Sequence, residues 1–149
     1  MNDSKVYLND EAFDFRTYDD LENVVDIFDL QSEFMDKSGQ IINGFVDSQA
    51  TLYSNLIQEE LDEFYAENYH DHASAKEACD IIVVASGYLI SLLGVEKAKR
   101  AYRLVHDSNM SKLQGKIEKR EDGKVLKNDL YKKQVKEKLM SDLKNLIDK

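Results

Sequence analysis

The chain of 149 residues contains no proline and no tryptophan, only 6 glycines and a single cysteine, Cys79. So little proline and glycine argues against a sandwich or barrel built from many tight turns, and it favours long helices. One cysteine excludes an internal disulfide framework and a cysteine-cluster zinc site. The longest apolar stretch, residues 81–95, is too short to span a bilayer, and residues 1–10 contain no signal peptide. We therefore expect a cytoplasmic protein without a membrane partner.

Charge is divided unequally along the chain, whose net charge is −9. Residues 1–80 carry 20 acidic and 4 basic side chains, whereas residues 81–149 carry 9 acidic and 16 basic ones. The acidic half would repel phosphates, so we expect no nucleic-acid partner. Two interpretations of the asymmetry stay open: solvated helix faces of opposite sign, or carboxylates that hold cations beside lysines that hold an anion.

Hydrophobic residues recur at helical spacing in five segments, which predicts an all-α fold, a four- to five-helix bundle formed by one domain, residues 1–149. The expected helices cover residues 19–37, 48–69, 74–93, 95–113 and 131–147. The third is apolar nearly all round, which places it at the centre of the bundle. Asp122-Gly123, between two short alternating runs, predicts a small β-hairpin over residues 116–127.

Five carboxylates lie at helical spacing on the second and third expected helices. Glu59, Glu60 and Glu63 fall within a sector of about 100°, and Glu77 and Asp80 also share a face. A short connection makes the two helices antiparallel neighbours, so the five carboxylates converge. A hard divalent cation would relieve their repulsion, and oxygen ligands favour Mg²⁺ or Mn²⁺. The alternative is a solvated acidic face, but Glu77 and Asp80 begin the most apolar helix.

The pattern Glu-Glu-x-x-Glu, followed after a short gap by Glu-x-x-Asp, resembles the signature of the all-α nucleoside triphosphate pyrophosphohydrolases. That superfamily includes the MazG-like proteins and phosphoribosyl-ATP pyrophosphohydrolase. Residues 105–112 and 122–127 are similar to the tail of MazG-like proteins, and the likeness extends over residues 20–131. The chain departs from the family at Asn128, where glycine and a proline-containing stretch often follow the lysine.

The resemblance implies Mg²⁺-dependent hydrolysis of a nucleoside or deoxynucleoside triphosphate to the monophosphate and pyrophosphate, with Mn²⁺ as a substitute metal. The implied metal ligands are Glu60, Glu63, Glu77 and Asp80. The implied catalytic residues are Glu59 and Glu60, with Glu59 as a further ligand or as the group that orients the attacking water. The implied phosphate-binding residues are Asn109, Lys112, Lys124 and Lys127. Candidate contacts to the base are Gln31 and Phe34.

The resemblance also implies that the chain assembles with itself, as a homodimer or homotetramer. A second copy would cover the apolar third helix and the C-terminal stripe, which comprises Val135, Leu139, Leu143 and Leu146. Two alternative functions stay open beside the one above: phosphoribosyl-ATP pyrophosphohydrolase, and a non-catalytic, metal-binding helical dimer.

Overall fold

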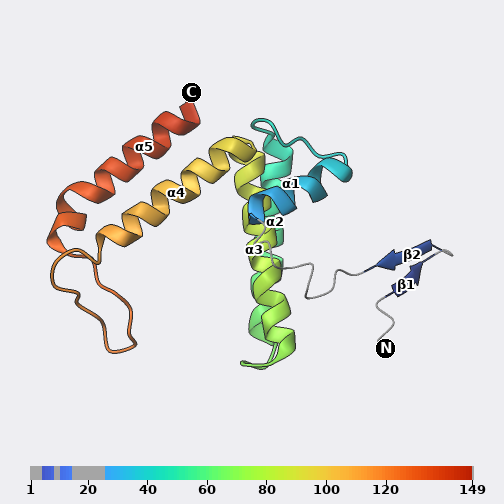
Figure 1. Cartoon of the computed structure of the whole chain (residues 1–149), viewed down its shortest axis with the longest axis horizontal. Coiled ribbons are helices and arrows are strands. Elements are labelled where there is room, and N and C mark those ends of the chain that lie inside the picture. Colours follow the sequence, from blue (N-terminus) through green and yellow to red (C-terminus); the bar gives the residue numbers. More distant parts are fainter. Residues whose placement is uncertain (1–4, 9–10, 15–25, 149) are drawn as a thin grey trace.

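The computed structural model describes residues 5–8, 11–14 and 26–148, and this part of the chain is predominantly helical (Figure 1). Its elements are β1 (Lys5–Leu8), β2 (Glu11–Asp14), α1 (Ile27–Lys37), α2 (Asp47–Ala66), α3 (His72–Leu93), α4 (Val95–Ser111), the π-helical turn η2 (Tyr131–Val135) and α5 (Lys136–Asp148). The predicted all-α class is thus confirmed. The start of the first expected helix, residues 19–25, lies outside the described residues.

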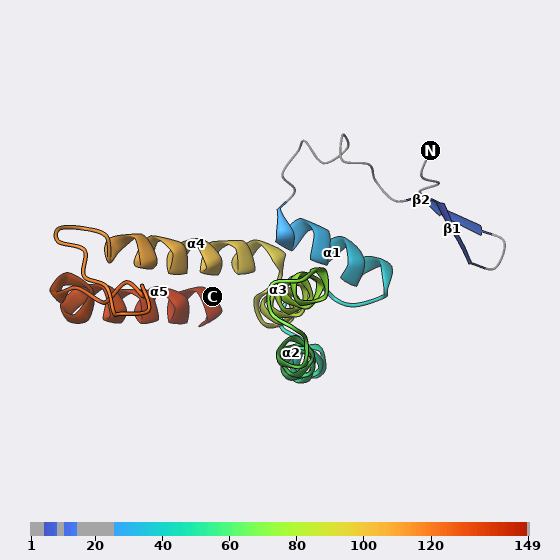
Figure 2. The same ribbon diagram turned by 90° about the horizontal axis from the view of Figure 1, so that it is seen from below.

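The helices form two arms that meet at the junction of α3 and α4 (Figures 1 and 2). In the first arm α2 packs along α3, and α1 packs against α3 from another side. In the second arm α5 runs back along α4. The predicted central position of the third helix is confirmed, because α3 contacts α1, α2 and α4. Within the described residues, no single helix combines the length and hydropathy needed to cross a membrane.

Capping residues mark the start of α1 and both ends of α3. The Asp26 carboxylate accepts a hydrogen bond from the Phe28 amide at the start of α1, and that of Asp71 accepts one from Ser74 at the start of α3. Gly94 ends α3 with a φ of +78°, a left-handed conformation that favours glycine. At this residue the chain bends by 115° into α4.

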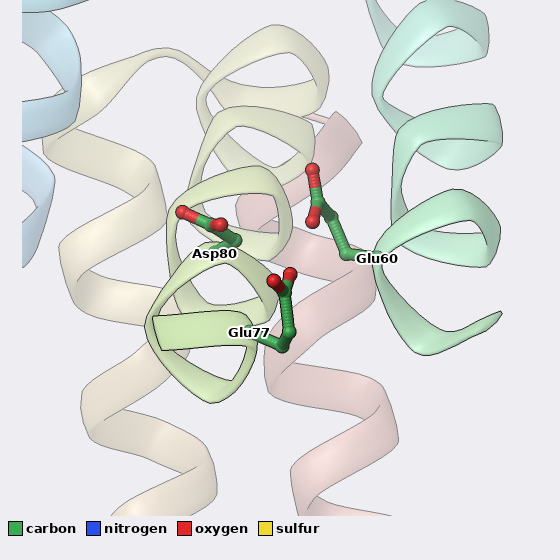
Figure 3. A group of neighbouring side chains, drawn as sticks. All are labelled: Glu60, Glu77 and Asp80. Carbon is green, nitrogen blue, oxygen red and sulfur yellow. The ribbon is translucent and has the colours of Figure 1, made fainter. Parts of the chain in front are cut away.

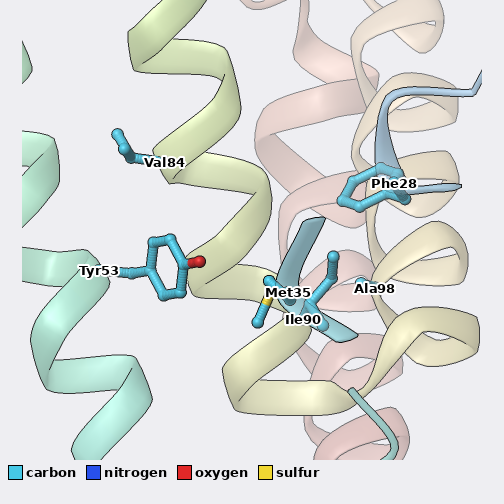
Figure 4. Packing of buried hydrophobic residues seen from close by; sticks show 6 residues of the cluster. All are labelled: Phe28, Met35, Tyr53, Val84, Ile90 and Ala98. Carbon is cyan, nitrogen blue, oxygen red and sulfur yellow. The ribbon is translucent and has the colours of Figure 1, made fainter. Parts of the chain in front are cut away.

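The hydrophobic core lies where α1, α2, α3 and α4 come together (Figure 4). Met35 and Ile90 are fully buried there, and Phe28 and Ala98 close the junction with α4. Tyr53 of α2 is buried against α3. Its hydroxyl donates to Gln40 Oε1 at 2.9 Å and accepts from Gln31 Nε2 at 3.1 Å, so the polar end of the ring is fully satisfied.

The hairpin predicted for residues 116–127 does not form as a two-stranded sheet. The turn at Asp122-Gly123 is present, but it is closed by a single bridge between Lys119 and Val125. The flanking residues are mostly charged and exposed, so no apolar face is available to stabilise a longer ladder. The structure instead places its two strands in the N-terminal segment, where β1 and β2 pair antiparallel.

Candidate metal centre

Three carboxylates converge between the C-terminal half of α2 and the N-terminal half of α3 (Figure 3). Glu60 extends from α2, and Glu77 and Asp80 extend from the first turns of α3. One oxygen from each lies within 4.8 Å of one oxygen from each of the others. We call these three residues the carboxylate cluster.

The local fold explains why these three side chains meet. The Asp71 cap fixes the start of α3, and Glu77 and Asp80 then lie on the side of α3 that packs against α2. Glu77 is only 7% exposed. The Oε2 atom of Glu60 is also buried, and no group among the described residues forms a hydrogen bond to it. Burying a carboxylate oxygen without a hydrogen-bond partner costs free energy, and a cation bound to that oxygen would remove the cost.

Electrostatics show the same deficit of positive charge. Burial raises the pKa of the Glu60 carboxyl above its ordinary value of 4.5, and the negative charges of Asp80, Glu63 and Glu77 raise it further. The nearby Lys76 ammonium acts in the opposite direction. The folded protein therefore disfavours the ionised form of Glu60 unless positive charge is supplied at the cluster.

Lys76 supplies one such charge from the first turns of α3. Its Nζ lies 2.7 Å from Asp80 Oδ2, and 3.0 Å and 3.3 Å from the two carboxylate oxygens of Glu77. The hydrogen bond to Asp80 contributes most to raising the pKa of Lys76, and the hydrogen bond to Glu77 contributes next. Together they hold this pKa well above its usual range. The sequence analysis did not single out Lys76, although its i,i+4 spacing to Asp80 is the usual signal of an ion pair on a helix.

The donor set and its dimensions fit a hard divalent cation. All three groups are carboxylates, which suit Mg²⁺ or Mn²⁺ rather than zinc. One oxygen from each of the three carboxylates lies within 4.8 Å of the other two, so the three would surround a single cation.

Two of the five predicted carboxylates lie outside this cluster. Glu63 is exposed on the next turn of α2, although it is near enough to raise the pKa of Glu60. Glu59 is also exposed. The structure therefore brings together Glu60, Glu77 and Asp80 as candidate metal ligands. Glu59 and Glu63 lie outside this group.

The predicted phosphate-binding residues lie together, but on the second arm. Lys112, Lys124 and Lys127 line a hollow of about 330 Å³ between the end of α4, the following loop and η2, together with Arg120 and Lys132. We call it the basic hollow. Asn109 is exposed one turn earlier on α4, where its side-chain oxygen accepts a hydrogen bond from Lys112 Nζ at 2.8 Å. In Figure 1 α4 leads this region away from the α2–α3 pair.

Tyr131 and Asn128 organise the basic hollow, and sequence reasoning missed both roles. The Nζ atoms of Lys112 and Lys127 lie 4.8 Å and 5.5 Å from the centre of the Tyr131 ring, so both ammonium groups form cation–π contacts with this ring. Asn128 accepts from the Tyr131 amide and donates to the Ser111 carbonyl. The spacing Asn-x-x-Tyr at the start of a helical run is a capping signal that could have revealed it.

The two candidate base contacts line the same apolar groove but differ in exposure. Gln31 is buried and donates its hydrogen bond to Tyr53, so it serves the core. Phe34 is 60% exposed and lines an apolar groove of about 330 Å³ with Leu30, Ile82 and Val83. The groove lies between α1 and α3, whereas the carboxylate cluster lies between α2 and α3.

Comparison of the chain with models of known protein families, with curated proteins and with solved structures finds no match.

Proposed function

We propose that this protein is a Mg²⁺-dependent hydrolase that converts a nucleoside or deoxynucleoside triphosphate to the monophosphate and pyrophosphate. The observation that carries the proposal is the convergence of Glu60, Glu77 and Asp80 from two helices, with one buried oxygen of Glu60 that has no hydrogen-bond partner among the described residues. Buried carboxylates arranged in this way suit a cation, and cations of this class promote phosphoryl chemistry.

The residues of the cluster would act by holding the metal and by orienting water. A bound Mg²⁺ supplies charge that neutralises the phosphoryl group and favours ionisation of a nearby water. Glu60, Glu77 and Asp80 are its ligands in this proposal, and the exposed Glu59 and Glu63 border the same face of α2. In the overall reaction one water adds to phosphorus, the bond between the α- and β-phosphates breaks, and pyrophosphate leaves.

The lysines would compensate the charge of the triphosphate. The basic hollow gathers Lys112, Lys124 and Lys127, three of the four predicted phosphate-binding residues. Because α4 carries this hollow away from the α2–α3 pair, we propose that the hollow of one copy serves the carboxylate cluster of a second copy. The proposed enzyme is then a homodimer or a larger homo-oligomer, in keeping with the exposed apolar groove along α1 and α3.

A pyrophosphate-release assay tests the proposal directly. The purified chain is given a panel of eight common nucleoside and deoxynucleoside triphosphates with Mg²⁺, and monophosphate and pyrophosphate are quantified. We expect Glu60→Gln to abolish turnover and Asp62→Asn to retain it, because Asp62 is exposed on the same helix and contacts Gln58. Full activity of Glu60→Gln would contradict the site. Metal binding without turnover on any nucleotide would favour the non-catalytic metal-binding dimer.

A further inference from the structure

The carboxylate cluster already contains a positive charge that belongs to the chain itself. The Lys76 ammonium is within 3.3 Å of both oxygens of Glu77 and within 2.7 Å of one oxygen of Asp80. Glu77 and Asp80 are two of the three residues whose oxygens converge. The same ammonium also stabilises the ionised form of Glu60, the third member. One lysine thus neutralises part of the charge of all three carboxylates.

We propose that Lys76 is a displaceable internal counter-ion of the metal site: its ammonium occupies the cluster in the metal-free protein and leaves when a divalent cation binds. This inference rests on the metal site of the proposed function and adds a residue that controls how tightly that site binds its ion.

Geometry makes the ammonium and the metal compete. Both carboxylate oxygens of Glu77 lie close to Nζ, so a divalent ion bound to Glu77 would lie beside a positive charge. At such separations like charges repel strongly, most of all next to a carboxylate that is 7% exposed. The divalent ion forms shorter, stronger contacts to the same oxygens than an ammonium does. Lys76 is therefore the partner that moves.

The lysine is free to leave without disturbing the fold. Its side chain is 62% exposed, and the four-carbon stem lets the ammonium reach solvent by rotation alone. Glu77 and Asp80, in contrast, are held on a helix that packs against α2. Displacement of Lys76 therefore changes one side chain rather than the helix arrangement.

Competition of this kind is reciprocal. The interaction that stabilises the metal-free cluster must be given up when the metal binds, so it weakens metal binding by the same free energy. Removing the ammonium should therefore tighten divalent-ion binding and lower the stability of the metal-free protein. This pairing of opposite effects distinguishes an internal counter-ion from a surface lysine that acts only through net charge.

Isothermal titration of the full chain with MgCl₂ and MnCl₂, at constant ionic strength, tests the inference. The key variants are Lys76→Met and, as a polar replacement, Lys76→Gln. Lys138→Met is the matched control, because Lys138 is 75% exposed and forms an i,i+4 pair with Asp142, as Lys76 does with Asp80. We expect both Lys76 variants to bind the ion with a dissociation constant about three- to tenfold lower than that of wild type or the control.

A second measurement follows the metal-free state. In EDTA, the Lys76 variants should melt below Lys138→Met, and saturating Mn²⁺ should remove that difference. If wild type binds the ion but neither Lys76 variant binds it more tightly than the control, the inference is overturned while the metal site stands. If neither wild type nor the Lys76 variants bind either ion, the metal site and the proposed function are overturned, and the inference with them.

Discussion

The ring of Tyr53 on α2 lies directly against the backbone of Gly87 on α3. A methyl group added at Gly87 would be 2.3 Å from the Cε1 atom of that ring, well inside van der Waals contact. The absence of a side chain at this residue is what lets α2 and α3 approach closely, about two turns from Glu60 along α2 and from Asp80 along α3.

Gly87→Ala should therefore destabilise the protein. The buried ring is held at its hydroxyl by Gln31 and Gln40, so it cannot move aside without losing hydrogen bonds. We expect a loss of about 1–3 kcal/mol in the free energy of unfolding, measured by urea denaturation. Gly44→Ala is the control, since a methyl group there meets no atom within 4 Å, and its effect should stay below about 1 kcal/mol. Equal effects of the two substitutions would contradict this account of the packing.

Divalent cations should raise the melting temperature. An ion that binds only the folded state adds about 2.7 kcal/mol when its free concentration is 100 times its dissociation constant, which corresponds to roughly 5–10 °C for a chain of this size. The shift should disappear in a Glu60→Gln, Asp80→Asn double variant. Differential scanning fluorimetry with Mg²⁺ at constant ionic strength measures the shift in wild type and in the double variant. An equal shift in the double variant would show that Mg²⁺ acts by general charge screening and not at the carboxylate cluster.

Stability of the metal-free protein should depend on pH through Glu60. Because burial and neighbouring carboxylates raise the pKa of Glu60 above 4.5, the folded state holds this proton more tightly than the unfolded state does. The free energy of unfolding therefore falls as pH rises above about 4.5 through the raised pKa. We expect Glu60→Gln to remove part of this fall in urea titrations with EDTA. Asp62→Asn controls for the change in net charge, and profiles identical to wild type for Glu60→Gln would contradict the prediction.

Assembly should be visible by light scattering at micromolar concentration. Phe34, Ile82 and Val83 are each more than 40% exposed along one apolar groove, and a second copy would bury them. We expect at least a dimer, and a mass near 17.2 kDa would contradict this.

A mixture of Glu60→Gln and Lys124→Ala, each inactive alone, should regain activity if the site is shared between copies. Continued inactivity despite subunit exchange would show that each site is built within one chain.

Helix positions were predictable from the sequence because their end signals are local. The third expected helix, residues 74–93, ends where α3 ends, and the second, residues 48–69, differs from α2 by one residue at its start and three at its end. The convergence of Glu60 with Glu77 and Asp80 followed from spacing and a short connection. The turn at Asp122-Gly123 was also local, but its extension into a ladder depended on an apolar face that the flanking residues do not supply.

What the sequence did not predict depends on packing between distant residues. Gln31 and Phe34 are one turn apart on α1. Gln31 is buried and donates a hydrogen bond to the Tyr53 hydroxyl, whereas Phe34 is exposed. Cys79, beside Asp80 on α3, is exposed. Glu59 and Glu63 share the face of Glu60 on a helical wheel, but only Glu60 reaches α3 closely enough to join the cluster.

The unequal burial of the two arms has a consequence for hydrogen exchange. None of the residues of α5 is fully buried against α4, whereas α3 buries eight of its own. A helix held by so few buried side chains opens at a lower free energy than the whole molecule. We therefore expect the amide protons of α5 to exchange while those of α3 are still protected. The carboxylates of Glu60, Glu77 and Asp80 would then keep their arrangement in molecules whose C-terminal helix has already detached.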